Sequence, residues 1–211
     1  MRRAGAIIRW AGMSLAVLAS ACTLLPEQKT VDIYRLPATQ AAPAPGGRAQ
    51  AWSLRIRSPH ANAVLDSARI AVIVQGDQIS TYGGARWTDA PPTLVRTRLA
   101  QAFRLDGRVA SVSTTDSNVR ADLELDSDLR AFQSEYRGAV PHAVVSLDVR
   151  LISTSTRRVV ASRSFEVAQP AGGVEVPAVV SAFGLATDAL AAQVVQWAVE
   201  QGAAVQSGRP E

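Results

Sequence analysis

The chain is poor in the residues that build metal sites and covalent cross-links. Among 211 residues it has one cysteine, Cys22, and two histidines, His60 and His142. With no second cysteine there is no intramolecular disulfide, so the fold must rest on a hydrophobic core. The same scarcity leaves no zinc ligand set, and we expect neither a metal nor another cofactor.

Motifs for covalent catalysis and phosphate binding are also missing. No Gly-x-Ser-x-Gly elbow occurs, and the pairs Gly83-Gly84 and Gly172-Gly173 lack the spacing of a phosphate-binding loop. His60 and His142 are the only histidine bases, and each lies next to a proline in an expected loop. These absences favour a protein that is not an enzyme. A hydrolase that uses His142 as its base stays open at this point.

Excess positive charge is small outside the first 21 residues. The chain has 22 basic and 18 acidic residues, but Arg2, Arg3 and Arg9 belong to an N-terminal segment without acids. The remainder has 19 basic and 18 acidic residues, a net charge of +1. The closest approach to a basic run is Arg157-Arg158, which is typical of a hairpin turn. A nucleic-acid partner is therefore not expected.

The N-terminus has the pattern of an export signal. Met1–Trp10 is basic, and Ala11–Ala21 is apolar and ends in small residues. The apolar part is shorter than the ~18 residues needed to span a bilayer. We therefore interpret residues 1–21 as a cleaved signal peptide.

Cys22 follows the expected cleavage point directly. This position resembles the lipobox of bacterial lipoproteins, in which the cysteine sulfur receives a diacylglyceryl group and the freed amine receives an acyl chain such as palmitate. Each buried CH₂ contributes about 0.8 kcal/mol, and two or more chains anchor a domain stably. An ordinary signal with an incidental Cys22 is the alternative.

The remaining chain predicts one domain between a tether and a tail. Residues 22–30 form the lipidated tether, residues 31–204 the domain and residues 205–211 a flexible tail, with a Pro/Gly-rich loop at 38–50. Alternating or β-branched segments predict strands at 31–36, 51–57, 68–74, 78–82, 108–113, 121–132, 143–153 and 158–167. Helical periodicity predicts helices at 90–103 and 177–201. The fold class is α/β: a single domain with one mixed, largely antiparallel sheet and two main helices.

One predicted strand carries a row of acids. Asp122, Glu124, Asp126 and Asp128 alternate with leucines, and their spacing admits either a calcium site or one face of a strand. A calcium loop of the EF-hand type needs a glycine turn and a terminal glutamate. The alternation with leucines favours the solvent side of a sheet.

The most distinctive local segment is 80–87. Here Tyr82, Arg86 and Trp87 flank the Gly83-Gly84 turn or bulge. The two aromatic side chains either pack over the edge of the sheet or, with Arg86, form a contact for a protein partner. Both interpretations stay open.

The ordered set of these features resembles the ABC-type transport auxiliary lipoprotein family, the PqiC-like lipoproteins. The resemblance covers essentially all of 22–211. Its pieces are Cys22, Tyr34-Arg35-Leu36-Pro37, the strand 69–74, Tyr82 with Arg86-Trp87, Pro91-Pro92, the alternating strands 123–132 and 145–152, and a long helix ending at Trp197.

The resemblance implies a non-catalytic lipoprotein of a Gram-negative envelope, tethered to the outer membrane and facing the periplasm. Its implied partners are an MCE-domain periplasmic protein and an ABC-type permease and ATPase, in a system that transports lipid. Cys22 is the one site residue that carries over. Phospholipid binding and homo-oligomerisation stay open. The alternatives are an outer-membrane assembly lipoprotein without a transport role and an envelope lipoprotein enzyme.

Overall fold

A computed structural model describes residues 30–38, 48–115 and 119–207. Cys22, most of the tether, residues 39–47 of the predicted loop and residues 208–211 of the predicted tail lie outside these ranges. The chain divides into the units Met1–Thr30 and Val31–Glu211. All of the described residues except Thr30 belong to the second unit.

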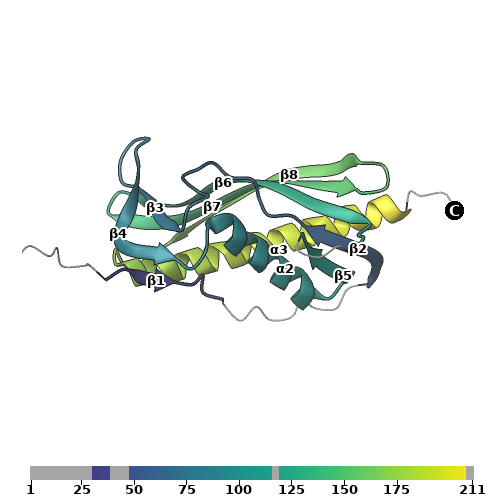
Figure 1. Cartoon of the computed structure of the whole chain (residues 1–211), viewed down its shortest axis with the longest axis horizontal. Helices are drawn as coiled ribbons and strands as arrows, with labels where there is room; N and C mark the ends of the chain where they lie inside the picture. The colour runs from purple at the N-terminus through teal and green to yellow at the C-terminus, as the bar shows by residue number, and fades with distance from the viewer. Residues whose placement is uncertain (1–29, 39–47, 116–118, 208–211) are drawn as a thin grey trace, which may run out of the picture. The chain divides into compact units, whose positions relative to one another are not determined.

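This unit contains one eight-stranded mixed sheet and two long helices, as the sequence predicts (Figure 1). In chain order its elements are β1 (Asp32–Tyr34), β2 (Gln50–Ile56), β3 (Arg69–Ile73), β4 (Ile79–Trp87), α2 (Pro91–Asp106), β5 (Val109–Thr114), β6 (Leu123–Arg137), β7 (Val140–Ser153), β8 (Arg158–Pro170) and α3 (Val176–Ser207).

The 15-residue strand β6 organises the sheet because it is long enough to pair with two strands in succession along one edge. The start of β6 pairs in parallel with β2, at Leu54 and Leu123, and its end pairs in parallel with β3, at Ala71 and Gln133. Beyond β2 lies β5, and beyond β3 lie β4 and β1. The other edge of β6 pairs along its length with β7, which pairs antiparallel with β8.

The two helices pack together and cover the sheet, α3 along β7 and β8 and α2 against β5. In α2 the side chains of Val95, Leu99 and Phe103 follow one stripe and are 0–1% exposed, as the periodicity predicts. Under α3, the ring of Phe183 stacks on Phe132 at 4.8 Å between centroids and meets Trp87 edge-on at 5.3 Å. This aromatic cluster joins α3 to the sheet.

By length and hydropathy alone, residues Val176–Val205 of α3 could cross a membrane. However, 61% of its most apolar window is buried inside the unit, with Phe183, Leu190 and Val194 fully buried. A helix that is apolar on most sides is expected at the centre of a core as well as in a bilayer. We therefore assign α3 as the core helix of this unit.

Several details differ from the sequence prediction. His142 lies in β7 rather than in a loop. The helix α3 continues to Ser207, so the first residues of the predicted tail at 205–211 are helical.

The strand β4 is also longer than expected, since it continues through Gly83-Gly84 to Trp87. Its pairing with β3 shifts register between Thr81 and Arg86, and Gly84 has φ +71°, a conformation that glycine adopts without strain. The glycine pair is therefore a bulge. This bulge sets the position of the residues that follow it.

Candidate functional site

The predicted partner contact lies on β4, and its three residues have different environments. Arg86 is exposed. Tyr82 is half-buried, and its hydroxyl donates a hydrogen bond of 3.1 Å to Ser134 Oγ on β6. Burial is the main reason that the pKa of Tyr82 is raised above its ordinary 10.0.

The structure corrects the prediction for Trp87 as a partner contact. Its side chain is only 1% exposed and packs edge-on against Phe132 and Phe183. The bulge at Gly84 turns Trp87 inward and leaves Arg86 outside. The alternative of packing therefore applies to Trp87, and the exposed part of these three residues comprises Arg86 with part of Tyr82.

A second arrangement, which the sequence analysis missed, secures the N-terminal end of the unit. Arg98 of α2 is 8% exposed and forms an ion pair with Asp188 of α3. Its Nη2 also donates hydrogen bonds to the carbonyl oxygens of Pro37, at 2.7 Å, and Leu36, at 3.3 Å. One guanidinium thus joins both helices to the segment that follows β1, and we call this arrangement the Arg98 clamp.

The same segment approaches α3 closely at Gly184. A Cβ atom at Gly184 would lie 2.9 Å from the carbonyl oxygen of Pro37, so only glycine allows this contact. The Arg98 clamp and this contact together hold the end of Tyr34-Arg35-Leu36-Pro37 on the helices. One sequence signal was available: Arg98 falls between Val95 and Leu99 on the buried stripe of α2, where an arginine needs a partner.

The acidic row lies on the charged side of the sheet, in alternation with the inward leucines. Asp126 is 9% exposed and receives two hydrogen bonds from Arg150 of β7, at 2.7 and 3.0 Å, and Arg150 also reaches Asp128 at 2.7 Å. Arg57, the residue directly after β2, lies with Nη1 3.1 Å from Glu124 Oε1. The hydrogen bonds from Arg150 to Asp126 and Asp128 raise the pKa of Arg150 further above its ordinary value. Glu124, Asp126 and Asp128 are therefore paired with arginines, and Asp122 accepts hydrogen bonds from Ser53 of β2. These contacts connect neighbouring strands laterally.

The two histidines lie apart in the fold: His60 lies between β2 and β3, outside the named strands, and His142 lies in β7. His60 forms an isolated parallel bridge with Asp128, and its Nε2 lies 3.6 Å from Asp126 Oδ1, beside a cavity of about 450 Å³ that is also lined by Arg57, Asp66 and Thr93. His142 pairs with Glu135 and Pro170. Within the described ranges, no group of three or more His, Cys, Asp or Glu side chains is placed to hold a metal ion.

Fold and sequence together define a class: single α/β domains with one mixed sheet and two long helices. Residues 34–195 match the family described as the ABC-type transport auxiliary lipoprotein component. The chain belongs to this family, and the resemblance found in the sequence is confirmed. The matched residues run from Tyr34, at the end of β1, to Val195 within α3.

Individual relatives support the same fold. The crystal structure of protein XCC0632 from Xanthomonas campestris is 30% identical, with a TM-score of 0.79, and the match covers 84% of this chain and 99% of that one. The hypothetical protein CT253 from Chlamydia trachomatis shares the fold alone, with 7% identity and a TM-score of 0.52 over 75% and 99% of the two chains. Protein bll6063 of Bradyrhizobium diazoefficiens is 30% identical over 175 residues, which are 82% of this chain and 46% of that protein. The matched region is thus less than half of the length of bll6063.

Proposed function

We propose that the protein is a non-catalytic docking component of an envelope lipid-transport system of the ABC type. Acylated Cys22 holds it at the outer membrane, facing the periplasm, and the domain binds an MCE-domain protein that works with a permease and an ATPase. The observation that carries the proposal is the family match over residues 34–195, which follows a lipobox-like Cys22 in the same chain.

The Arg98 clamp supports a tethered role. In an anchored protein, thermal motion of the domain pulls on the chain where the tether enters the fold. The entering strand β1 has only three residues at the edge of the sheet, and it pairs with β4 alone. The bonds from Arg98 to the carbonyls of Leu36 and Pro37 secure this weak element to both helices.

For the partner contact we propose Arg86 with the exposed part of Tyr82. Arginine and tyrosine side chains are enriched where protein interfaces concentrate their binding energy. Arg86 stands beside Ile33 of β1, which is 55% exposed, so a cation and an apolar side chain lie next to each other on this edge. The packing of Trp87 in the core supports the position of the neighbouring Arg86.

The experiment that tests the proposal is affinity capture of tagged, full-length protein from gently solubilised envelopes. Wild type is compared with Cys22→Ala, which tests the anchor, and with Arg86→Ala, which tests the contact. We expect an MCE-domain protein and its permease to co-purify with wild type. Recovery of these partners should fall in both variants, and Cys22→Ala alone should also leave the membrane fraction.

Other outcomes separate the alternatives. Capture of outer-membrane assembly factors without any transport component would favour the assembly lipoprotein. An envelope activity that is lost in His142→Ala while partner binding stays intact would favour an enzyme. Unchanged membrane retention of Cys22→Ala would contradict anchoring through Cys22.

A further inference from the structure

Exposed apolar side chains gather at one end of the sheet. The turn between β3 and β4 and the turn between β6 and β7 lie at this end, because β3 and β6 run in parallel and pair at Ile73 and Glu135. The segment between β8 and α3 lies there too, since Ala171 N donates a hydrogen bond to Pro141 O at 2.9 Å. We call this the hairpin end.

Four large apolar side chains are exposed at the hairpin end. Val74 is 62% exposed, Ile79 41%, Val140 44% and Val174 53%. They come from three separate connections of the chain, so their gathering is a product of the fold. Exposed apolar side chains that cluster mark an interaction site more often than scattered ones do.

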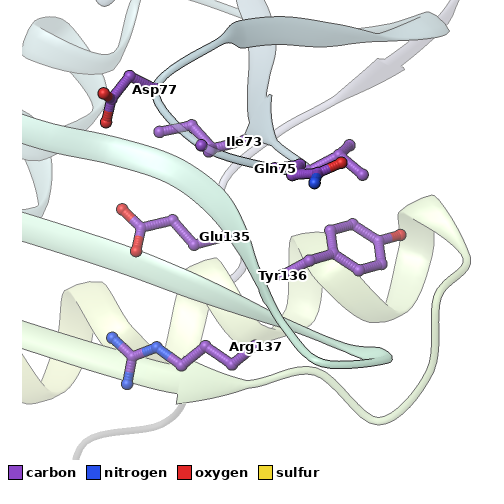
Figure 2. Close-up of a pocket in the computed structure, with 8 residues that line it drawn as sticks. Ile73, Gln75, Asp77, Glu135, Tyr136 and Arg137 are labelled. Atoms are coloured by element: carbon purple, nitrogen blue, oxygen red, sulfur yellow. The ribbon is translucent and has the colours of Figure 1, made fainter.

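Polar and aromatic groups lie among these apolar residues. A pocket of about 310 Å³ opens between the two turns. Figure 2 shows Gln75 and Asp77 of the β3–β4 turn on one side of it and Tyr136 and Arg137 of β6 on the other. Tyrosine and arginine beside aliphatic side chains are typical of segments that sit at the interface between lipid and water.

The chain enters the domain from the same side. Because β1 pairs in parallel with β4, the start of β1 is directed toward the start of β4, which follows the β3–β4 turn. Eight residues separate Cys22 from Val31 in the sequence. Eight residues of fully extended chain reach at most ~29 Å, so an anchor at Cys22 keeps the hairpin end within reach of the bilayer.

We propose that the hairpin end is a membrane-contact surface, at which Val74, Ile79, Val140 and Val174 insert shallowly into the lipid bilayer that holds the anchor. This inference rests on the proposed acylation of Cys22. Its consequence is a fixed orientation: the hairpin end faces the bilayer, and the opposite end, with Leu105 and Val159, faces away from it.

The test uses full-length acylated protein in vesicles of phosphatidylethanolamine with a minority of phosphatidylglycerol. Since Cys22 is the only cysteine and its thiol carries lipid in this protein, Val74→Cys or Val140→Cys supplies the single free thiol for an environment-sensitive dye. Leu105→Cys and Val159→Cys are matched controls, because these apolar residues are 49% and 54% exposed at the opposite end.

The emission of the dye at position 74 or 140 should shift to the blue, since interfacial side chains lie ~5–10 Å into the headgroup boundary. When the vesicles contain doxyl-labelled phospholipid, the emission should also fall at least about twofold through quenching. The dye at Leu105 and Val159 should stay unquenched. Flotation of the same samples reports the anchor separately: protein that fails to float refutes the anchoring. Floating protein in which all four positions behave alike overturns the membrane contact. The dye at Val74 could instead shift to the blue only when transport components are added, without quenching by the labelled lipid. That result overturns the membrane contact in favour of a protein contact.

Discussion

Removing the charge of Arg98 should destabilise the whole domain and loosen its N-terminal strand. The side chains of Arg98 and Asp188 are 9% and 16% exposed, so they form a largely buried pair. Loss of one partner from a buried pair costs about 3–5 kcal/mol, because the other charge stays buried. Some solvent reaches Asp188, which places the expected cost of Arg98→Met at the lower end, at about 3 kcal/mol.

Urea unfolding monitored by the fluorescence of the core tryptophans measures this cost. With an m-value of about 2 kcal/mol/M, the midpoint should fall by roughly 1.5 M urea. Arg104→Met is the matched control, since Arg104 lies exposed on the same helix, and it should change stability by no more than about 0.5 kcal/mol. Amide exchange should accelerate in β1 of Arg98→Met.

A double-mutant cycle sharpens the test. Asp188→Leu alone leaves the buried guanidinium without its carboxylate, whereas Arg98→Met together with Asp188→Leu removes both charges. The double variant should therefore be more stable than the sum of the two single costs by about 1–3 kcal/mol. A midpoint for Arg98→Met equal to that of Arg104→Met, or strict additivity in the cycle, would refute the clamp as described.

Two further predictions concern the core and its edge. A Cβ at Gly202 of α3 would lie 2.4 Å from Trp52 Cζ2, so Gly202→Ala should lower the stability of the domain by ~1–3 kcal/mol in the same urea assay. Gly172 has open space around it, so the control Gly172→Ala should change stability by no more than ~0.5 kcal/mol. Because the pKa of Tyr82 is raised above 10.0 chiefly by burial, the folded state favours the neutral phenol. Its contribution to stability is full below pH 10.0 and is lost as pH rises through the raised folded-state pKa. Tyr82→Phe should lower stability by ~1 kcal/mol at neutral pH, because the hydrogen bond to Ser134 is lost. The variant should also lose less stability than wild type as the pH rises above 10.0. An equal loss of stability at alkaline pH in the variant and in wild type would contradict the role of Tyr82.

Local pattern was sufficient to predict most elements of this fold. The alternation of leucines with acids in β6, and of apolar with polar residues in β7, predicts strands with one buried face, and those faces are buried as expected. The helical periodicity at 90–103 and 177–201 predicts two helices, which the structure contains as α2 and α3. Strand and helix periods are properties of neighbouring residues, so they can be read without knowledge of the rest of the chain.

Only the tertiary structure decided which buried faces meet. The pairing of β6 with both β2 and β3 along one edge is a non-local parallel arrangement that no local pattern specifies. It brings together the turns of the hairpin end, and the packing of α2 on α3 brings Arg98 to Asp188. The bulge at Gly84 likewise turned Trp87 into the core. Periodicity shows that a face is buried, but its partner depends on register and chain path, which are set by the packing of segments far apart in sequence.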